Sequence, residues 1–193
     1  MSKLDIGCGV DPSGGYIGID PILGTDFWTF TIPDNLSEVM FSHSVYMLNG
    51  VGAPPRQICT RTQVRKSVQM YLCGLIDIFE LNEQIFSPER FWSYFENLSA
   101  RLRELSFNMP PGARFVFEQP MLVRMAKTRI SKFKYIYLRL TKKKIYTLEN
   151  AIDTEFFQTH NFFTVDEALI RRLLSSADIL QLEIRDGVLM GSP

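Results

Sequence analysis

A glycine-rich stretch near the start of the chain, residues 3–20 with the sequence KLDIGCGVDPSGGYIGID, constrains the fold more than any other part. Leu4 and Ile6 predict a short buried strand, which ends in a Gly-x-Gly turn. A second glycine turn leads into a second strand, residues 16–19, which ends on Asp20. This order predicts an α/β sheet with a turn that brings bare backbone close to a ligand, although the same turn could join two core strands without one.

Spacing and charge separate the ligands that such a turn could bind. A dinucleotide fingerprint needs a third glycine and an acid about 20 residues further on, whereas this chain has a proline there and reaches its acid 13 residues after the first glycine. The lysine and hydroxyl residue of a P-loop are absent. Asp5, Asp11 and Asp20 flank the turn, with no cation between Lys3 and Arg56. These charges favour a cationic nucleoside without phosphate.

The stretch resembles the S-adenosylmethionine motif of class I methyltransferases, in the short type whose second strand reads Gly-Tyr-Ile-x-x-Asp. The resemblance implies a three-layer, Rossmann-like α/β fold whose sheet is mostly parallel with an antiparallel C-terminal hairpin strand. It implies S-adenosylmethionine as the cofactor, with Asp20 accepting hydrogen bonds from the ribose. The cofactor-binding residues predicted in this way are Asp5, Gly7, Cys8, Gly9, Asp20, Pro21, Asp26, Ser42 and Ser44.

Two segments after the glycine-rich stretch extend the predicted site. Residues 25–31, TDFWTFT, predict a short strand or extended connection, and in the resembled family an acid here contacts adenine, for which Asp26 is the candidate. Residues 38–44, EVMFSHS, predict a buried strand that leaves the core at Ser42. Carboxyl ends of parallel strands meet at one crevice, so this strand end should face the same ligand. His43 is the predicted catalytic base, although it could simply cap the strand end.

Composition sets the broad class. A chain of 193 residues with 46% hydrophobic and 22% charged residues suits one globular domain, and a formal net charge of zero does not by itself indicate a nucleic-acid or membrane protein. Three cysteines without C-x-x-C spacing indicate neither a disulfide framework nor a metal site. No apolar run is long enough to span a membrane. We therefore predict a soluble, unprocessed, cytoplasmic protein, whose oligomeric state the sequence leaves open.

The remaining elements follow from periodicity and capping signals. A helix over 62–83 is predicted within a helical insertion at 50–86, and Ser87 with Pro88 predicts the start of a second helix that ends before residue 110. A strand over 113–118 comes next. Further along, Thr164 and Glu167 predict a capping box, followed by a helix, a strand over 179–184 and an Asp-Gly hairpin into 188–190.

A basic insertion at 119–158 is the strongest charge asymmetry of the chain. Nine lysines and arginines lie between Arg124 and Lys144, interleaved with aromatic residues, and no acid occurs from 119 to 148. Such a pattern is typical of a surface that binds nucleic acid or another polyanion. A basic segment on an anionic membrane, or a solvated surface, would have the same composition.

Three functions remain open from the sequence. The first is a methyltransferase that moves a methyl group from S-adenosylmethionine to an oxygen or nitrogen atom of a small-molecule or sugar acceptor. The second keeps this chemistry but uses RNA or another polyanion, bound by the segment from Arg124 to Lys144. The third is a non-catalytic cofactor-binding protein, since Tyr46-Met47-Leu48 stands where relatives of the resembled type often have Glu-His-Leu.

Overall fold

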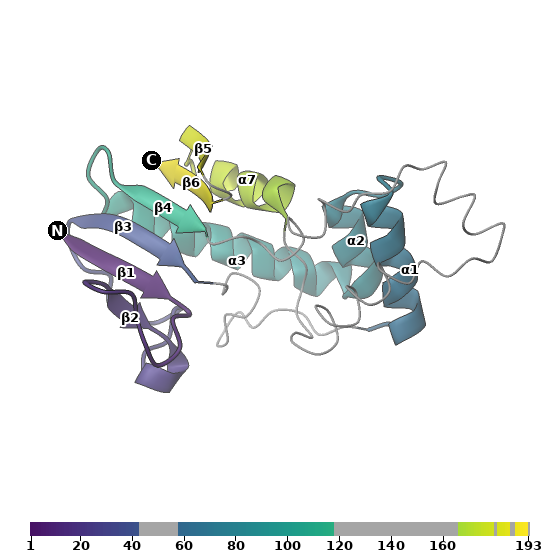
Figure 1. Ribbon diagram of the computed structural model, residues 1–193, viewed down its shortest axis with the longest axis horizontal. Coiled ribbons are helices and arrows are strands. Elements are labelled where there is room, and N and C mark those ends of the chain that lie inside the picture. Colours follow the sequence, from purple (N-terminus) through teal and green to yellow (C-terminus); the bar gives the residue numbers. More distant parts are fainter. Residues whose placement is uncertain (43–57, 118–165, 180, 186–187, 193) are drawn as a thin grey trace.

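The computed structural model describes residues 1–42, 58–117, 166–179, 181–185 and 188–192. Its strands form one six-stranded sheet with the order β2-β1-β3-β4-β6-β5 (Figure 1). The strand bounds are β1 Ser2–Ile6, β2 Ile17–Ile19, β3 Leu36–Phe41, β4 Arg114–Phe117, β5 Gln181–Arg185 and β6 Val188–Ser192.

Four neighbouring strands of the sheet, β2, β1, β3 and β4, run parallel to one another, whereas β6 is antiparallel to both β4 and β5. Their order, 2-1-3-4, is that of a doubly wound sheet, in which the chain leaves β1 on one side and later returns to its other side. The predicted fold class, an α/β fold with a mostly parallel sheet and an antiparallel C-terminal hairpin, is therefore confirmed.

One face of the sheet is apolar and packs against helices α3 (Pro88–Phe107) and α7 (Glu167–Ser176). Alternate strand residues supply this face, and their exposed fractions are 0–1% for Leu4, Ile6, Val39, Phe41, Phe115 and Phe117. Burying each of these large side chains contributes about 1.5–3 kcal/mol. α3 meets them with an apolar stripe that includes Phe91, Phe95, Leu98, Leu102 and Leu105. The helix starts at the expected N-cap Ser87, with Pro88 in its first turn.

The opposite face carries charge. Lys3, Glu38 and Arg114 are neighbours across β1, β3 and β4, and Asp5 lies two residues after Lys3 on the same face. Glu38 is 5% exposed, pairs with Arg114 and accepts a hydrogen bond from the Tyr16 hydroxyl. The two faces of the sheet therefore differ, since the hydrophobic core packs on one and the charged side chains lie on the other.

The single helix predicted over 62–83 is wrong, because the chain forms α1 (Arg61–Leu72) and α2 (Ile78–Ile85) instead. Gly74 adopts a left-handed backbone with φ 66°, and Asp77 accepts hydrogen bonds from the first amides of α2 in a capping box with Glu80. A glycine stop and an aspartate start are local signals that end one helix and begin another. They outweigh the continuous apolar period across the segment.

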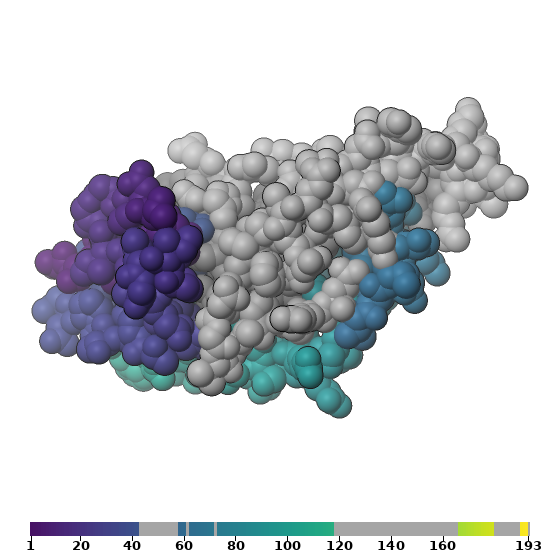
Figure 2. Space-filling model, turned by 90° about the horizontal axis from the view of Figure 1, so that it is seen from below, coloured from purple at the N-terminus to yellow at the C-terminus, as the bar shows by residue number. Residues whose placement is uncertain are grey.

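Figure 1 shows the arrows of β1, β3 and β4 pointing toward the side of the molecule on which α1 and α2 lie. In Figure 2 the surface of residues 1–42 gathers at one end, and that of α1 and α2 lies toward the other. Among the described helices, none combines the length and apolar character needed to cross a membrane.

Some predictions about the later elements need correction or fall outside the described residues. The N-cap of α7 is Asp166, whose side chain accepts a hydrogen bond from the amide of Leu169, so the prediction of Thr164 as the cap is wrong by two residues. The basic insertion at 119–158 and the first part of the helical insertion, 50–57, lie outside the described residues. The division into one domain with two insertions stays a prediction.

Candidate functional site

The carboxyl ends of β1 and β3 lie side by side at the point where the strand order reverses. Gly7 follows β1 and Ser42 follows β3, and the amide of Ser42 donates to the carbonyl of Ile6 at 3.0 Å. In open α/β sheets, ligands bind outside the strand ends at such a switch point. The structure thus brings together the two segments in which the sequence predicted a site.

The glycine turn after β1 has a backbone that L-residues rarely adopt. Gly7 and Gly9 have φ of 73° and 66°, and the amide of Gly7 donates to the carbonyl of Ile19 at 2.9 Å. Any other residue in this left-handed region costs about 1–2 kcal/mol. The turn therefore requires glycine, and it closes tightly onto the end of β2.

Asp20 fastens this turn to the segment that follows β2. Its Oδ2 accepts from the amide of Gly9 at 3.0 Å, and its Oδ1 accepts from the amide of Ile22 at 2.9 Å, which caps the short 3-10 helix η1 (Pro21–Leu23). A carboxylate offers about four acceptor positions, so two bonds leave capacity for a ligand hydroxyl. The predicted contact with a ribose stays a prediction.

Asp5 joins the turn to the end of β3. It is 1% exposed, and its Oδ2 accepts from the amide of Ser13 at 2.9 Å while its Oδ1 accepts from the Ser42 hydroxyl at 2.6 Å. The sequence predicted Asp5 and Ser42 as separate cofactor contacts. In the structure they bond to each other, so their first role is to hold the two strand ends in register.

Both carboxylates lack a cationic partner within the described residues: neither Asp5 nor Asp20 forms an ion pair there. Their hydrogen bonds come from backbone amides and from one hydroxyl, which are neutral. Among the residues that the structure describes, nothing therefore compensates the negative charge at the carboxyl end of β1, a partly buried place where Coulomb interactions are stronger than in water. Such a place attracts a cation and repels a phosphate.

Cys8 packs inside the turn. A Cβ placed on Gly18 would lie 2.9 Å from its Sγ, 3.2 Å from Pro12 and 2.6 Å from Leu23, so these three side chains occupy the space that the absent side chain of Gly18 leaves. Burial raises the pKa of the Cys8 thiol, and the nearby charges of Asp5 and Asp20 raise it further. The thiol therefore stays protonated at neutral pH, which makes it a poor nucleophile.

Residues 26–30 form a turn that hydrogen bonds to Asp26 close, so the prediction of a short strand or extended connection over 25–31 is wrong. Asp26 accepts from the amide of Trp28 at 3.0 Å through its side chain, and from the amides of Thr29 and Phe30 through its carbonyl. The side chain of Phe27 is 3% exposed and packs against Phe41 at the end of β3, with ring centroids 5.9 Å apart. Local hydrogen bonding by aspartate and burial of the aromatic ring outweigh the β-propensity of the segment.

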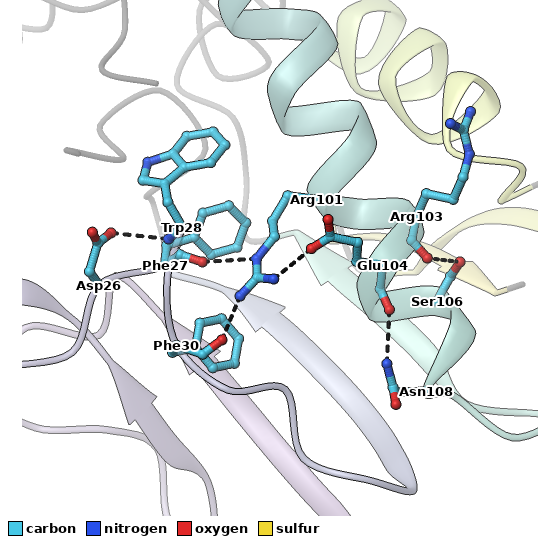
Figure 3. A network of polar contacts seen from close by, with 9 residues as sticks. All are labelled: Asp26, Phe27, Trp28, Phe30, Arg101, Arg103, Glu104, Ser106 and Asn108. Atoms are coloured by element: carbon cyan, nitrogen blue, oxygen red, sulfur yellow. Dashed lines mark hydrogen bonds and ion pairs between the residues drawn. The ribbon is translucent and has the colours of Figure 1, made fainter. Parts of the chain in front are cut away.

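Arg101 on α3 binds this turn through its side chain (Figure 3). The sequence did not predict this role. Its guanidinium donates to the carbonyls of Phe27 and Phe30 at 3.1 and 2.7 Å. Nothing in the helical pattern around Arg101 distinguishes it from a solvated arginine, so only the fold reveals its role. Nothing in the sequence indicates the role of Ser13 either, because this residue bonds Asp5 through its backbone amide rather than through its side chain.

The remaining predicted site residues divide into two groups. Pro21 is exposed in the first position of η1, where its fixed φ suits a helix start. His43 and Ser44 lie outside the described residues. Among the residues that the structure describes, no cluster of three or more histidine, cysteine, aspartate or glutamate side chains could hold a metal ion.

No protein-family model and no curated protein matches the sequence. Among solved structures, the crystal structure of the S-adenosylmethionine-dependent methyltransferase SibL in its apo form matches with a TM-score of 0.44 and 12% identity. The match covers 99% of this chain and 50% of that protein, so this chain spans about half its length. A likeness of this degree carries no weight in the assignment of function, which depends on the site itself.

Proposed function

We propose that this protein is an S-adenosylmethionine-dependent methyltransferase that moves a methyl group to an oxygen or nitrogen atom of a small-molecule or sugar acceptor. One observation carries the proposal. At the switch point of the sheet, a left-handed glycine turn lies between Asp5 and Asp20, two carboxylates that form no ion pair within the described residues. Bare backbone and negative charge suit a nucleoside that carries a sulfonium cation and no phosphate.

The chain's own residues would bind and orient this cofactor. A methyl group on a sulfonium already has a good leaving group, so holding donor and acceptor in line supplies much of the rate. The free acceptor positions of Asp20 suit a diol, and nothing lies within 4 Å of a Cβ placed on Gly9, so a ligand can approach the backbone of the turn there. An acceptor that loses a proton also needs a base, for which His43 is the prediction from sequence.

Replacement of Asp20 tests the binding site. Because Asp20 also caps a helix, the experiment needs a control variant that removes a helix cap elsewhere. Asp77 is a suitable control, because its side chain likewise caps a helix, accepting from the amides of Phe79 and Glu80 at 2.8 Å. We expect Asp20→Ala to weaken binding of S-adenosylmethionine about tenfold or more, as loss of a hydrogen-bonded charge does, and Asp77→Ala to leave it within about twofold. Isothermal titration calorimetry measures both. An unchanged affinity in Asp20→Ala would remove the assignment.

Turnover separates the proposed enzyme from the two alternatives. Formation of S-adenosylhomocysteine with small hydroxyl and amine acceptors supports the proposal. Formation only with RNA, together with binding that weakens steeply with salt, would favour the basic segment from Arg124 to Lys144 as the acceptor site. Tight cofactor binding without turnover on either panel would favour the non-catalytic alternative. The cytoplasmic location stays a prediction that cell fractionation can check.

A further inference from the structure

Arg101 connects helix α3 to a turn more than 70 positions earlier in the chain. Its side chain is 11% exposed. Its Nε donates to the carbonyl of Phe27 at 3.1 Å, its Nη2 to the carbonyl of Phe30 at 2.7 Å, and its Nη1 to Glu104 at 2.6 Å. The guanidinium carbon also lies 4.8 Å from the ring centroid of Phe30. One side chain thus makes three directed bonds and a cation–π contact in a nearly buried place.

The bonded carbonyls belong to the turn that carries Asp26. Inside the turn, the amides of residues 28–30 all donate to Asp26, and these bonds close the loop without fixing where it lies on the protein. Arg101 supplies the hydrogen bonds from the turn to α3 (Figure 3), where Trp28 also packs against Tyr94 with ring centroids 5.8 Å apart. On the other side, Phe27 packs against Phe41 at the carboxyl end of β3. The turn is therefore clamped between the helix and the strand end that borders the candidate site.

We propose that Arg101 is a positioning residue for this ligand site: it sets the place of the Asp26 turn beside the strand ends and so preorganises the site. The inference rests on the proposed function, because it presumes that a cofactor binds there. Arginine suits the task, since its planar fork bonds two carbonyls and a carboxylate together, whereas a lysine ammonium is a single point charge on a flexible stem. A preorganised site loses less conformational entropy when the ligand binds.

The chain contains a matched control two residues further along the same helix. Arg103 also bonds a carboxylate and a carbonyl, those of Asp178 and Ser176, but both lie at the end of α7 rather than on the turn (Figure 3 shows Arg103 pointing away from Arg101). Replacing Arg103, whose side chain is 45% exposed, therefore removes one bond to a carboxylate and one to a carbonyl from α3 and leaves the Asp26 turn untouched.

Calorimetry with S-adenosylhomocysteine gives the first test. We expect Arg101→Lys and Arg101→Met to weaken binding about tenfold relative to the unaltered protein, as the loss of one or two charge-assisted bonds would, and Arg103→Met to stay within about twofold. Arg101→Lys keeps the positive charge, so it is the variant that disturbs folding less. Affinities in both Arg101 variants within twofold of the unaltered protein, or an equal loss in Arg103→Met, would overturn the proposal.

Fluorescence of Trp28 reports the turn directly and needs no ligand. The chain has two tryptophans, and Trp92→Phe removes the other while keeping a ring stacked on Phe79. The indole nitrogen of Trp28 is buried, so release of the turn should shift its emission to longer wavelength in Arg101→Lys and Arg101→Met but not in Arg103→Met. No shift in the Arg101 variants would overturn the positioning role. Absence of S-adenosylhomocysteine binding by the unaltered protein, with the shift present, would instead count against the proposed function alone.

Discussion

Asp5 and Glu38 are buried carboxylates on the same face of the sheet, and the protein holds them in opposite ways. Glu38, on β3, lies opposite Lys3 and Arg114 in the strand register and pairs with both cations while accepting from the Tyr16 hydroxyl. Asp5 lies on β1, two residues after Lys3 toward the carboxyl end, and within the described part of the chain it accepts only from a backbone amide and a serine hydroxyl. One carboxylate is neutralised, and the other is solvated by neutral groups.

The difference separates a structural region from a binding region. At the amino end of the strands, the carboxylate of Glu38 is compensated by two cations, Lys3 and Arg114, and needs no further partner. At the carboxyl end, Asp5 and Asp20 order the turn and the strand ends but leave their charge uncompensated within the described residues. A buried charge is expensive unless it is paired, so a cationic ligand at this end would gain energy that an uncharged one would not.

The largest predicted effect comes from exchanging each carboxylate for its amide. Asp5→Asn should cost about 2 kcal/mol of unfolding free energy, because its two hydrogen bonds to a charged acceptor become weaker bonds of a neutral amide, which can still accept from the amide of Ser13 and donate to the hydroxyl of Ser42. Glu38→Gln should cost about 1 kcal/mol, since the side chains of Arg114 and Lys3 are 51% and 43% exposed and their ion pairs are screened by solvent. Urea unfolding gives both values.

The same pair of variants tests the comparison itself. Asp5→Asn should weaken S-adenosylmethionine binding about tenfold, as removal of a buried charge near a cation does, whereas Glu38→Gln should leave it within about twofold. Equal losses in the two variants would show that the ends of the strands do not differ in the way proposed.

A smaller loss of stability is expected from a substitution at Gly18, on β2 beside Asp5. Gly18 is the register neighbour of Asp5, and a Cβ there would lie 2.6 Å from Leu23 and 2.9 Å from the Sγ of Cys8. Gly18→Ala should therefore destabilise the protein by about 1 kcal/mol through overpacking. Gly14→Ala is the control, because nothing lies within 4 Å of its added Cβ. Equal melting temperatures for the two variants would contradict the packing account.

The smallest effect concerns the titration of Cys8. Burial is the main cause of its raised pKa, and Asp5 adds to it. Since the folded pKa exceeds the unfolded one, the thiol contributes stability that is present below its ordinary pKa of 9.0 and is lost as pH rises through the folded value. Asp5→Asn should lower the pKa of Cys8 toward 9.0, and Glu38→Gln should not. Iodoacetamide alkylation against pH, with Cys59→Ser and Cys73→Ala in both backgrounds, measures the difference.

Much of the framework was predictable because its signals are local. Alternating apolar residues identified β1 and β3, the Ser87-Pro88 pair placed the start of α3, and the glycines located the turn whose φ values the structure shows. The break between α1 and α2 is equally local, since Gly74 and Asp77 signal it, although the apolar period continues across it. The prediction for residues 25–31 was wrong for a different reason. It depended on β-propensity, which takes no account of the burial of Phe27 or of the hydrogen bonds from Arg101.

By itself the sequence determined the places where the backbone must turn, the positions of the acids along the chain and the absence of cations from residue 4 to residue 55. The tertiary structure alone decided which groups those acids meet: Ser42 lies 37 positions from Asp5, and Arg101 lies 74 positions from Phe27. Periodicity and capping arise from bonds between residues a few positions apart. Partners at such distances depend on strand order and on the helix face that packs against the sheet, which no local pattern encodes.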